Sequence, residues 1–436
     1  MITVNMTATS EKINSISGIW LAGRVLSDFD LGTLNRVDGN GRKRPTVSTA
    51  DAVTAYCGVL CTGRKDFDDI EPFRGDEQFR QALGIGHVPS EGRLRKRFLT
   101  HAGFLAAELG RRNARAVWGA NPKRTRLSDG SEYTLTDIDV SPHDNSGTRK
   151  EGLGWTYKHY NGFAPNYAYV GEEGYMVHCE LRPGQQHSQN GTPAFLQQVI
   201  DWTPDGRRLL FRMDSGYDAA ENLRLIERQK HKYIVAVNQR SVDTSEVIED
   251  TRALGDVVLD DGTKRVYTYS ERVSVTGPNG GLRKRRRVVR LTETWVEKNG
   301  QRLVIPLTEL NMWWTNLPLP SSEIIKLYCE HGTSEQFHSE LKTDLDLERL
   351  PSSSFACNEV VLAIGMVAYN VLRRISLDAV PIAPKAKVKR LRLRTVITEI
   401  MRLAGKFACH GNRWWLRINQ DEPYFPVLRQ LYQAYT

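Results

Sequence analysis

Residues 207–239, RRLLFRMDSGYDAAENLRLIERQKHKYIVAVNQ, contain the elements that decide the fold of the chain. The run RRLLFRMDS predicts a strand that ends at Asp214, and KYIVAVNQ from Lys232 predicts a second strand. Between them, AAENLRLIERQ carries apolar residues at the spacing of an amphipathic helix. The stretch therefore predicts a strand, a helix and a strand in immediate succession, as in an α/β protein.

The residues before this stretch add three strands and a helix. YTLTDIDVS (133–141), NYAYVG (166–171) and YMVHCELRPG (175–184) are β-like runs, and the helical segment TPAFLQQVIDW (192–202) follows them. Three strands, a helix, a strand, a helix and a strand form the order of an RNase-H-like core. We therefore predict an α/β RNase-H-like catalytic core.

The remaining sequence divides into segments around this core. Residues 240–312 predict strands joined by the turns DDG, GPNGG and KNG, so we expect a β-rich insertion. The N-terminal part has mainly helical patterns, and PIAPKAK predicts a linker into a basic helical C-terminal segment. The expected segments are a helical domain (1–125), the first part of the core (126–239), the insertion (240–312), the second part of the core with the catalytic helix (313–380) and the basic C-terminal segment (381–436).

The charge of the chain is basic and clustered. Sixty Lys and Arg face 51 Asp and Glu, a net charge of +9. RLRKR begins at Arg93, PKRTR at Pro122 and RKRRR at Arg283, and residues 381–417 hold many further Lys and Arg. Basic clusters of this kind indicate a polyanionic partner, most often nucleic acid.

One basic cluster lies on a predicted helix near the N-terminus. A short helix in DEQFRQALGI (76–85), a turn and a basic helix in PSEGRLRKRFLTHAGFLAAELGRR (89–112) resemble a helix-turn-helix. The second helix would then enter a DNA groove, whereas the alternative is a solvated helix that binds nothing. The candidate DNA contacts on it are Arg93, Arg95, Lys96 and Arg97.

Cysteine usage and hydropathy predict a reducing, aqueous environment. The six cysteines form no CxxC pair, so we expect no structural zinc. The first 20 residues lack the basic and apolar regions of a signal peptide. The longest apolar stretch, VVLAIGMVAYNVL (360–372), is too short to cross a bilayer. We therefore expect a soluble, cytoplasmic protein with no membrane partner.

A polar stripe follows the insertion, in LYCEHGTSEQFHSELKTDLDLERL (327–350). On a continuous α-helix, four polar side chains would fall within an arc of about 60°, with Phe337 and Leu341 on the opposite side. These four are Tyr328, His331, Glu335 and Lys342. The stripe is either functional or a merely solvated helix face.

Three carboxylates favour the functional interpretation. Asp139 ends the first core strand, Asp214 ends a later one, and Glu335 lies on the polar stripe. Carboxylates from two strand ends and a facing helix can converge on two Mg²⁺ or Mn²⁺ ions, which suit phosphoryl transfer. Asp137 leaves the strand on the same face as Asp139 and is an open alternative. Asp214 could instead cap the helix that follows it.

The chain resembles a known family at these positions. TDIDVS, LRPGQQHSQNGTPAFLQ, FRMDSGYDAAENLRLIE, RLAGKFACHGNRWWLRI and the helix at 328–342 are similar to bacterial insertion-sequence transposases of the DDE superfamily, in the group numbered thirteen-eighty. The resemblance implies a two-metal DNA strand transferase with an RNase-H-like core and a β insertion before the catalytic glutamate. It implies that Asp139, Asp214 and Glu335 are catalytic.

The resemblance also implies DNA contacts on the polar stripe. A tyrosine, arginine, glutamate and lysine signature of related elements maps onto Tyr328, His331, Glu335 and Lys342, with histidine in place of arginine. Histidine is only partly charged near pH 7, so its contact with a phosphate would be weaker. Tyr328 would contact a phosphate and would not act as a nucleophile.

Further DNA contacts are expected in the insertion and directly after it, where Trp313 and Trp314 precede the catalytic helix. The RKRRR run would contact the backbone, and Trp313 or Trp314 would stack on a flipped base unless it packs in the core. The basic run consists of Arg283, Lys284, Arg285, Arg286 and Arg287.

The implied reaction is cut-and-paste transposition. Water would attack a phosphodiester at each terminal inverted repeat with the help of two Mg²⁺ ions, for which Mn²⁺ would substitute. The freed 3′-OH would then attack another strand, and finally target DNA. The implied assembly is a homodimer on paired DNA ends, in the bacterial cytoplasm at the nucleoid. The alternatives are an inactive transposase-derived DNA-binding protein and an RNase-H-like nuclease without strand transfer.

Overall fold

The computed structural model describes residues 8, 12–39, 45–276, 282–298, 301–302, 304–384, 388–410 and 413–435. Its helices are α1 Ile19–Leu26, α2 Thr49–Cys61, α3 Glu77–Ala82, α4 Glu91–Thr100, α5 Ala102–Gly119, α6 Thr192–Asp201, α7 Ala220–Arg228, α8 Thr244–Leu254, α9 Ser321–Cys329, α10 Thr333–Ser339, α11 Phe355–Ala379, α12 Leu393–Val396 and α13 Phe425–Tyr435. Its strands are β1 Lys12–Asn14, β2 Thr125–Arg126, β3 Glu132–Val140, β4 His143–Asp144, β5 Gly154–Trp155, β6 Asn161–Phe163, β7 Asn166–Val170, β8 Tyr175–Glu180, β9 Leu209–Met213, β10 Lys232–Ala236, β11 Asp256–Asp260, β12 Lys264–Thr276, β13 Leu282–Thr294, β14 Glu297–Lys298, β15 Gln301–Arg302, β16 Leu307–Thr315, β17 Gly405–His410 and β18 Arg413–Arg417.

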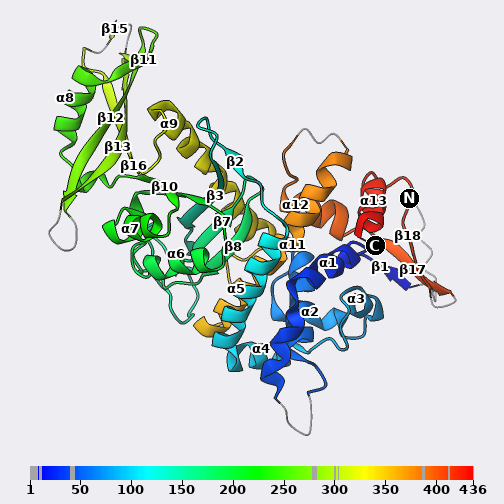
Figure 1. Cartoon of the computed structure of the whole chain (residues 1–436). Helices are drawn as coiled ribbons and strands as arrows, with labels where there is room; N and C mark the ends of the chain where they lie inside the picture. Colours follow the sequence, from blue (N-terminus) through cyan, green and yellow to red (C-terminus); the bar gives the residue numbers. More distant parts are fainter. Residues whose placement is uncertain are drawn as a thin grey trace.

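A large mixed sheet forms the centre of the molecule (Figure 1). Part of it has the order β8-β7-β3-β9-β10, with β3, β9 and β10 parallel and β7 and β8 antiparallel to their neighbours. The predicted succession of strands and helices is present, and a small sheet of β4, β5 and β6 is inserted between β3 and β7. The α/β prediction from residues 207–239 is therefore confirmed.

Helices cover both faces of this sheet, which explains why its strands read as apolar runs. Side chains of α6 and α7, such as Phe195 and Leu223, pack on the face that carries Ile138. Ile324 of α9 packs on the opposite face, with Leu135 and Leu210. Because side chains alternate along β3, Asp137 and Asp139 emerge on the α9 face.

The insertion continues the same sheet. Strand β16 pairs with β10, and β13, β12 and β11 follow it outward (Figure 1). The predicted boundary at 312 falls inside β16, and the insertion contains a helix, α8, that the strand pattern did not predict. The DDG turn is present with Gly262 at φ 82°, a conformation that glycine adopts easily. The GPNGG turn and the last two residues of KNG lie outside the described residues.

The N- and C-terminal segments form one helical unit. Helix α11 packs against α2 and α5, and the core around it includes apolar residues of α1, α12 and α13. Strand β1 pairs with β17, which pairs with β18, so segments from both ends of the chain share one sheet. The prediction of a purely helical C-terminal segment is wrong, because Phe407 and its neighbours pair as a hairpin.

Helix α11 is long and apolar enough to cross a membrane, but 83% of its apolar 18-residue stretch is buried inside the protein. The predicted run of apolar residues at 360–372 is the middle of this helix. Tertiary packing therefore accounts for its hydrophobicity.

Candidate functional site

Asp139 and Asp214 emerge side by side from two parallel strands. Ile138 of β3 is in register with Met213 of β9, and the two aspartates are the next residues on each strand. Asp139 has a quarter of its side chain exposed, and Asp214 is exposed. Asp214 also accepts a hydrogen bond from the Gly216 N–H at 2.9 Å, so it caps the turn that follows.

The two carboxylates repel each other. Loss of hydration around Asp214, and second the negative charge of Asp139, raise the pKa of Asp214 to about 6. Carboxylate oxygens held close together with excess negative charge are the ligands that Mg²⁺ and Mn²⁺ prefer. The side chains present therefore fit a divalent cation.

The raised pKa of Asp214 predicts a pH dependence of stability. An acid whose pKa is raised on folding binds more protons in the folded state, so the free energy of unfolding falls as the pH rises from about 4 to about 6. Without metal, we expect Asp214→Asn to melt about 1–2 °C above wild type at pH 7 and at the wild-type temperature near pH 4. Calorimetry in EDTA measures both midpoints. Asp205→Asn, in an exposed loop, is the control, and equal midpoints for Asp214→Asn and wild type at both pH values would contradict the expectation.

Asp137 lies inside the protein and is already paired. Its two carboxylate oxygens accept from Arg212 Nε and Nη2 at 2.6 and 2.8 Å, and His331 Nδ1 lies 2.9 Å from Oδ1. Burial alone would raise the pKa of Asp137, but the charges of Arg212 and His331 hold it at about 2. Arg212 also donates to the Leu327 carbonyl, which fixes the end of α9 to the sheet.

The polar stripe after the insertion is broken into short pieces, so the prediction of one helix through residues 328–342 is wrong. Helix α9 ends at Cys329, a 3-10 turn covers Glu330–Gly332, α10 follows, and a π-helical turn covers Glu340–Asp344. Changes from α to 3-10 and π geometry alter the angle between successive side chains. The four side chains of the predicted stripe therefore do not follow one regular helix face, although the rings of Tyr328 and His331 remain neighbours, 5.8 Å apart.

Those side chains have different surroundings. The half-buried Tyr328 ring lies 5.4 Å from Trp313, and the buried His331 pairs with Asp137. Lys342 donates to the Pro142 carbonyl. Glu335 is exposed and forms no hydrogen bond or ion pair with the described residues. Among those residues, no three His, Cys, Asp or Glu side chains are arranged to hold a metal ion. Glu335 therefore does not form a three-carboxylate group with Asp139 and Asp214 in this structure.

His338 belongs to the site although the sequence interpretation did not include it. Its Nε2 lies 3.1 Å from Asp139 Oδ2, and its Nδ1 lies 3.3 Å from the Tyr169 hydroxyl. His338 follows Glu335 by three residues in EQFH, and residues at this spacing share a helix face. That spacing is the signal that could have identified it.

A cavity of about 510 Å³ adjoins the carboxylate pair. Trp313 and Tyr328 line it, together with Ser215, the residue after Asp214. Trp314 points to the opposite face of the sheet, where its Nε1 donates to Asp218 at 3.2 Å. The cavity also includes polar residues that the sequence interpretation missed, namely Asn238, Gln239, Arg240 and Asn311.

The RKRRR run is not uniformly available to a ligand. Arg283 and Lys284 are exposed, whereas Arg285 and Arg287 are each 8% exposed. Arg287 donates twice to Glu271. Arg286, half-buried, donates to two backbone carbonyls. The run lies on a strand in which side chains alternate between faces, so Lys284 and Arg286 face away from Arg283, Arg285 and Arg287.

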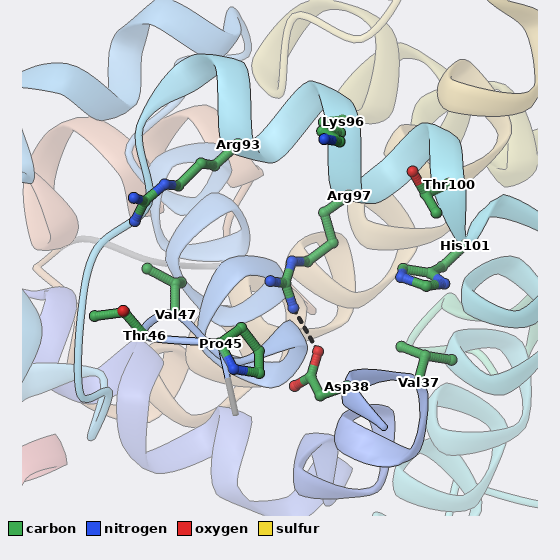
Figure 2. Close-up of a pocket in the computed structure, with 10 residues that line it drawn as sticks. All are labelled: Val37, Asp38, Pro45, Thr46, Val47, Arg93, Lys96, Arg97, Thr100 and His101. Carbon is green, nitrogen blue, oxygen red and sulfur yellow. Dashed lines mark hydrogen bonds and ion pairs between the residues drawn. The ribbon is translucent and has the colours of Figure 1, made fainter. Parts of the chain in front are cut away.

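The predicted basic helix at 89–112 is divided into α4 and α5 at His101. Figure 2 shows a cavity beside α4, with Arg97 directed toward Asp38 at 2.5 Å. Arg95 pairs with Glu91. Arg93 and Lys96 are exposed at the cavity, which has a volume of about 570 Å³. Its lining residues are Val37, Asp38, Pro45, Thr46, Val47, Arg93, Lys96, Arg97, Thr100 and His101.

Comparisons with known proteins give a match to a family model and to several solved structures. A family model described as transposase DDE domain group 1 matches residues 12–435. The cryo-EM structure of a piggyBac transposase synaptic complex with hairpin DNA is similar, with a TM-score of 0.48 and 10% identity, over 88% of this chain and 80% of that one. No curated protein sequence matches the chain.

Proposed function

The chain belongs to the transposase DDE domain group 1 family, and on this basis we propose that it cuts DNA at terminal inverted repeats and transfers the freed strands into target DNA. The observation that carries the proposal is the pair of carboxylates, Asp139 and Asp214, at the ends of two parallel strands. Their mutual repulsion favours a divalent cation between them. Assignment to the insertion-sequence group numbered thirteen-eighty is part of the same proposal.

The strand order supports an RNase-H-like core. Three antiparallel strands, β8, β7 and β3, lie beside the parallel pair β9 and β10, with the two carboxylates at the ends of β3 and β9. Ligands in open α/β sheets bind outside the carboxyl ends of parallel strands. The position of the carboxylate pair is therefore the one expected for a catalytic site.

Asp139, Asp214 and Glu335 are the proposed metal ligands. Asp139 is favoured over Asp137, because Arg212 and His331 already neutralise Asp137 in the interior. Glu335 is supported by its position one turn before His338, which contacts Asp139. Glu335 would complete the site when DNA and cations bind.

A bound pair of Mg²⁺ or Mn²⁺ ions would activate the attacking oxygen and stabilise the leaving oxygen. The protein's own groups would orient the DNA and hold the ligands in place. Tyr328 is unsuited to act as a nucleophile, since burial, and then the charges of Asp214 and Asp139, raise the pKa of its hydroxyl. Tyr328 and Lys342 are proposed as phosphate contacts, whereas His331 would act through Asp137.

Trp313 is the better candidate for stacking on an extruded base. Both tryptophans are buried, as the core-packing alternative expects, but Trp313 lines the cavity beside Ser215 and Tyr328. Trp314 faces the other side of the sheet. A base in this cavity would meet an aromatic wall and the polar side chain of Asn311.

A product assay tests the proposed function. A labelled duplex with the element's terminal repeat is incubated with the full chain and Mg²⁺ or Mn²⁺, and then with target DNA. We expect cuts at the repeat boundary followed by hairpin or joined products. Cuts without any joining would favour the nuclease alternative, and tight binding without cuts would favour the inactive DNA-binding alternative. Size-exclusion chromatography with one or two ends tests the proposed homodimer.

Arg93 and Lys96 are the proposed DNA contacts of the N-terminal unit. Each phosphate contact contributes about one unit to the slope of log affinity against log salt concentration. We therefore expect the double variant Arg93→Ala, Lys96→Ala to lower this slope by about two and to weaken binding about tenfold at moderate salt. Fluorescence anisotropy at several salt concentrations measures both quantities. Arg111→Ala, at an exposed arginine of α5, is the matched control, and an unchanged slope for the double variant would contradict the assignment.

A further inference from the structure

Two histidines connect the segment that carries Glu335 to strand β3. His331 Nδ1 lies 2.9 Å from Asp137 Oδ1 as an ion-pair contact without hydrogen-bond geometry, and His338 Nε2 forms a hydrogen bond of 3.1 Å with Asp139 Oδ2. The two histidines are only 9% and 5% exposed. The two imidazole rings are therefore shielded from water. A polar contact in such an environment is electrostatically stronger than the same contact at the surface.

The spacing of the two contacts places Glu335 between them. Asp137 and Asp139 are two residues apart on a strand, so both side chains point to the same face. Glu335 follows His331 by four residues and precedes His338 by three. Glu335 itself makes no hydrogen bond or ion pair with the described residues, so its position depends on what holds its segment.

The contact of His338 with Asp139 has a defined direction. An ionised carboxylate only accepts hydrogen bonds, so Nε2 of His338 donates to Oδ2 of Asp139. Nδ1 forms a second hydrogen bond, of 3.3 Å, with the hydroxyl of Tyr169 on β7. This arrangement fixes the imidazole ring and occupies one oxygen of Asp139. The other oxygen, Oδ1, has no partner among the described residues and is open to a cation.

The contact at His331 is held from the other side. Arg212 of β9 donates twice to Asp137 and once to the Leu327 carbonyl at the end of α9. Arg212 therefore holds Asp137 in place independently of His331. The 3-10 turn at Glu330–Gly332, which follows α9, turns the chain so that His331 points inward.

We propose that His331 and His338 are positioning residues that tether the Glu335 segment to β3, so that Glu335 meets Asp139 and Asp214 when divalent cations and DNA bind. The inference rests on the proposed function, because it assumes that these three carboxylates hold the cations. Groups that orient metal ligands affect metal affinity about 10- to 100-fold when they are removed.

Two substitutions of His338 test the tether. Gln places an N–H donor at a reach similar to Nε2, whereas Leu removes the donor and keeps an apolar volume. We expect His338→Leu to bind Mn²⁺ about tenfold more weakly in calorimetric titrations, with DNA affinity within twofold of wild type. His338→Gln should recover most of the Mn²⁺ affinity. Amides of residues 333–339 should exchange hydrogen faster in His338→Leu than in His338→Gln.

The outcomes separate this inference from the proposed function. If wild type binds Mn²⁺ and Glu335→Gln weakens that binding, but His338→Leu binds Mn²⁺ like wild type, the tether is wrong and the function stands. If Glu335→Gln leaves Mn²⁺ binding unchanged, the site assignment fails, and the tether fails with it. If His338→Leu does not fold, Tyr169→Phe replaces it, because it removes only the hydroxyl that orients Nδ1. Tyr169→Phe should weaken Mn²⁺ binding about two- to threefold, and wild-type affinity would contradict the tether.

Discussion

Replacing Asp139, Asp214 or Glu335 by its amide should reduce DNA strand cleavage about 1000-fold or more. An amide retains the shape of the side chain but removes the charge that binds a divalent cation. DNA affinity should stay within about twofold of wild type, because the lost groups are negative and do not attract phosphates. Single-turnover cleavage of a labelled terminal repeat measures the rate, and anisotropy measures the affinity.

A matched variant makes this expectation specific. Asp137→Asn lies two residues from Asp139 but removes a buried charge that Arg212 and His331 neutralise. We expect this variant to lose thermal stability. The cleavage rate of a variant that has lost a metal ligand should rise with the Mn²⁺ concentration. The cleavage rate of Asp137→Asn should not. Wild-type cleavage by Glu335→Gln would overturn the assignment of the third carboxylate.

Arg373→Leu should destabilise the protein by about 3–5 kcal/mol, the second large effect. Arg373 and Glu340 are both fully buried and form an ion pair between α11 and the π-helical turn after α10. Arg373 also donates to the Tyr369 hydroxyl at 2.9 Å. Removing the guanidinium leaves the Glu340 carboxylate without its ion-pair partner in the interior, where burial already raises its pKa.

A double-mutant cycle measures this pair. Unfolding midpoints are compared for Arg373→Leu, Glu340→Leu and the variant with both changes. The double variant should be more stable than Arg373→Leu alone, because it leaves no isolated charge in the core. Arg374→Leu, at a more exposed neighbouring arginine, is the control. A melting temperature for Arg373→Leu equal to that of Arg374→Leu would contradict the expectation.

Local sequence patterns predicted much of the core because its elements are short and buried. The apolar runs that precede Asp139 and Asp214 are buried strands. Each aspartate stands at the point where its strand leaves the apolar core. A carboxylate at such a strand end needs solvent, a ligand or a polar partner in the protein. The pattern therefore marked the strand-end aspartates as candidate ligands and left Asp137 and Asp139 as alternatives. The insertion was likewise visible from its turn residues, although α8 within it was not.

Patterns failed where distant segments decide the local structure. Strand β1 exists because it pairs with β17, which lies almost 400 residues later. The polar stripe follows a helical period, but His331 turns inward to Asp137 and breaks it. The RKRRR run looked like one basic surface, yet Arg285 and Arg287 are buried on one side of a paired strand.

The sequence by itself determined the succession of strands and helices and the basic character, and it placed Asp214 and either Asp137 or Asp139 at strand ends as candidate ligands. Each of these follows from residues that are close together in the chain. Only the tertiary structure decided that Asp137 is neutralised inside, that His338 reaches Asp139 and that Trp313 rather than Trp314 borders the site. These are contacts between residues about 75 to 200 positions apart, and their energies depend on packing that no local pattern encodes.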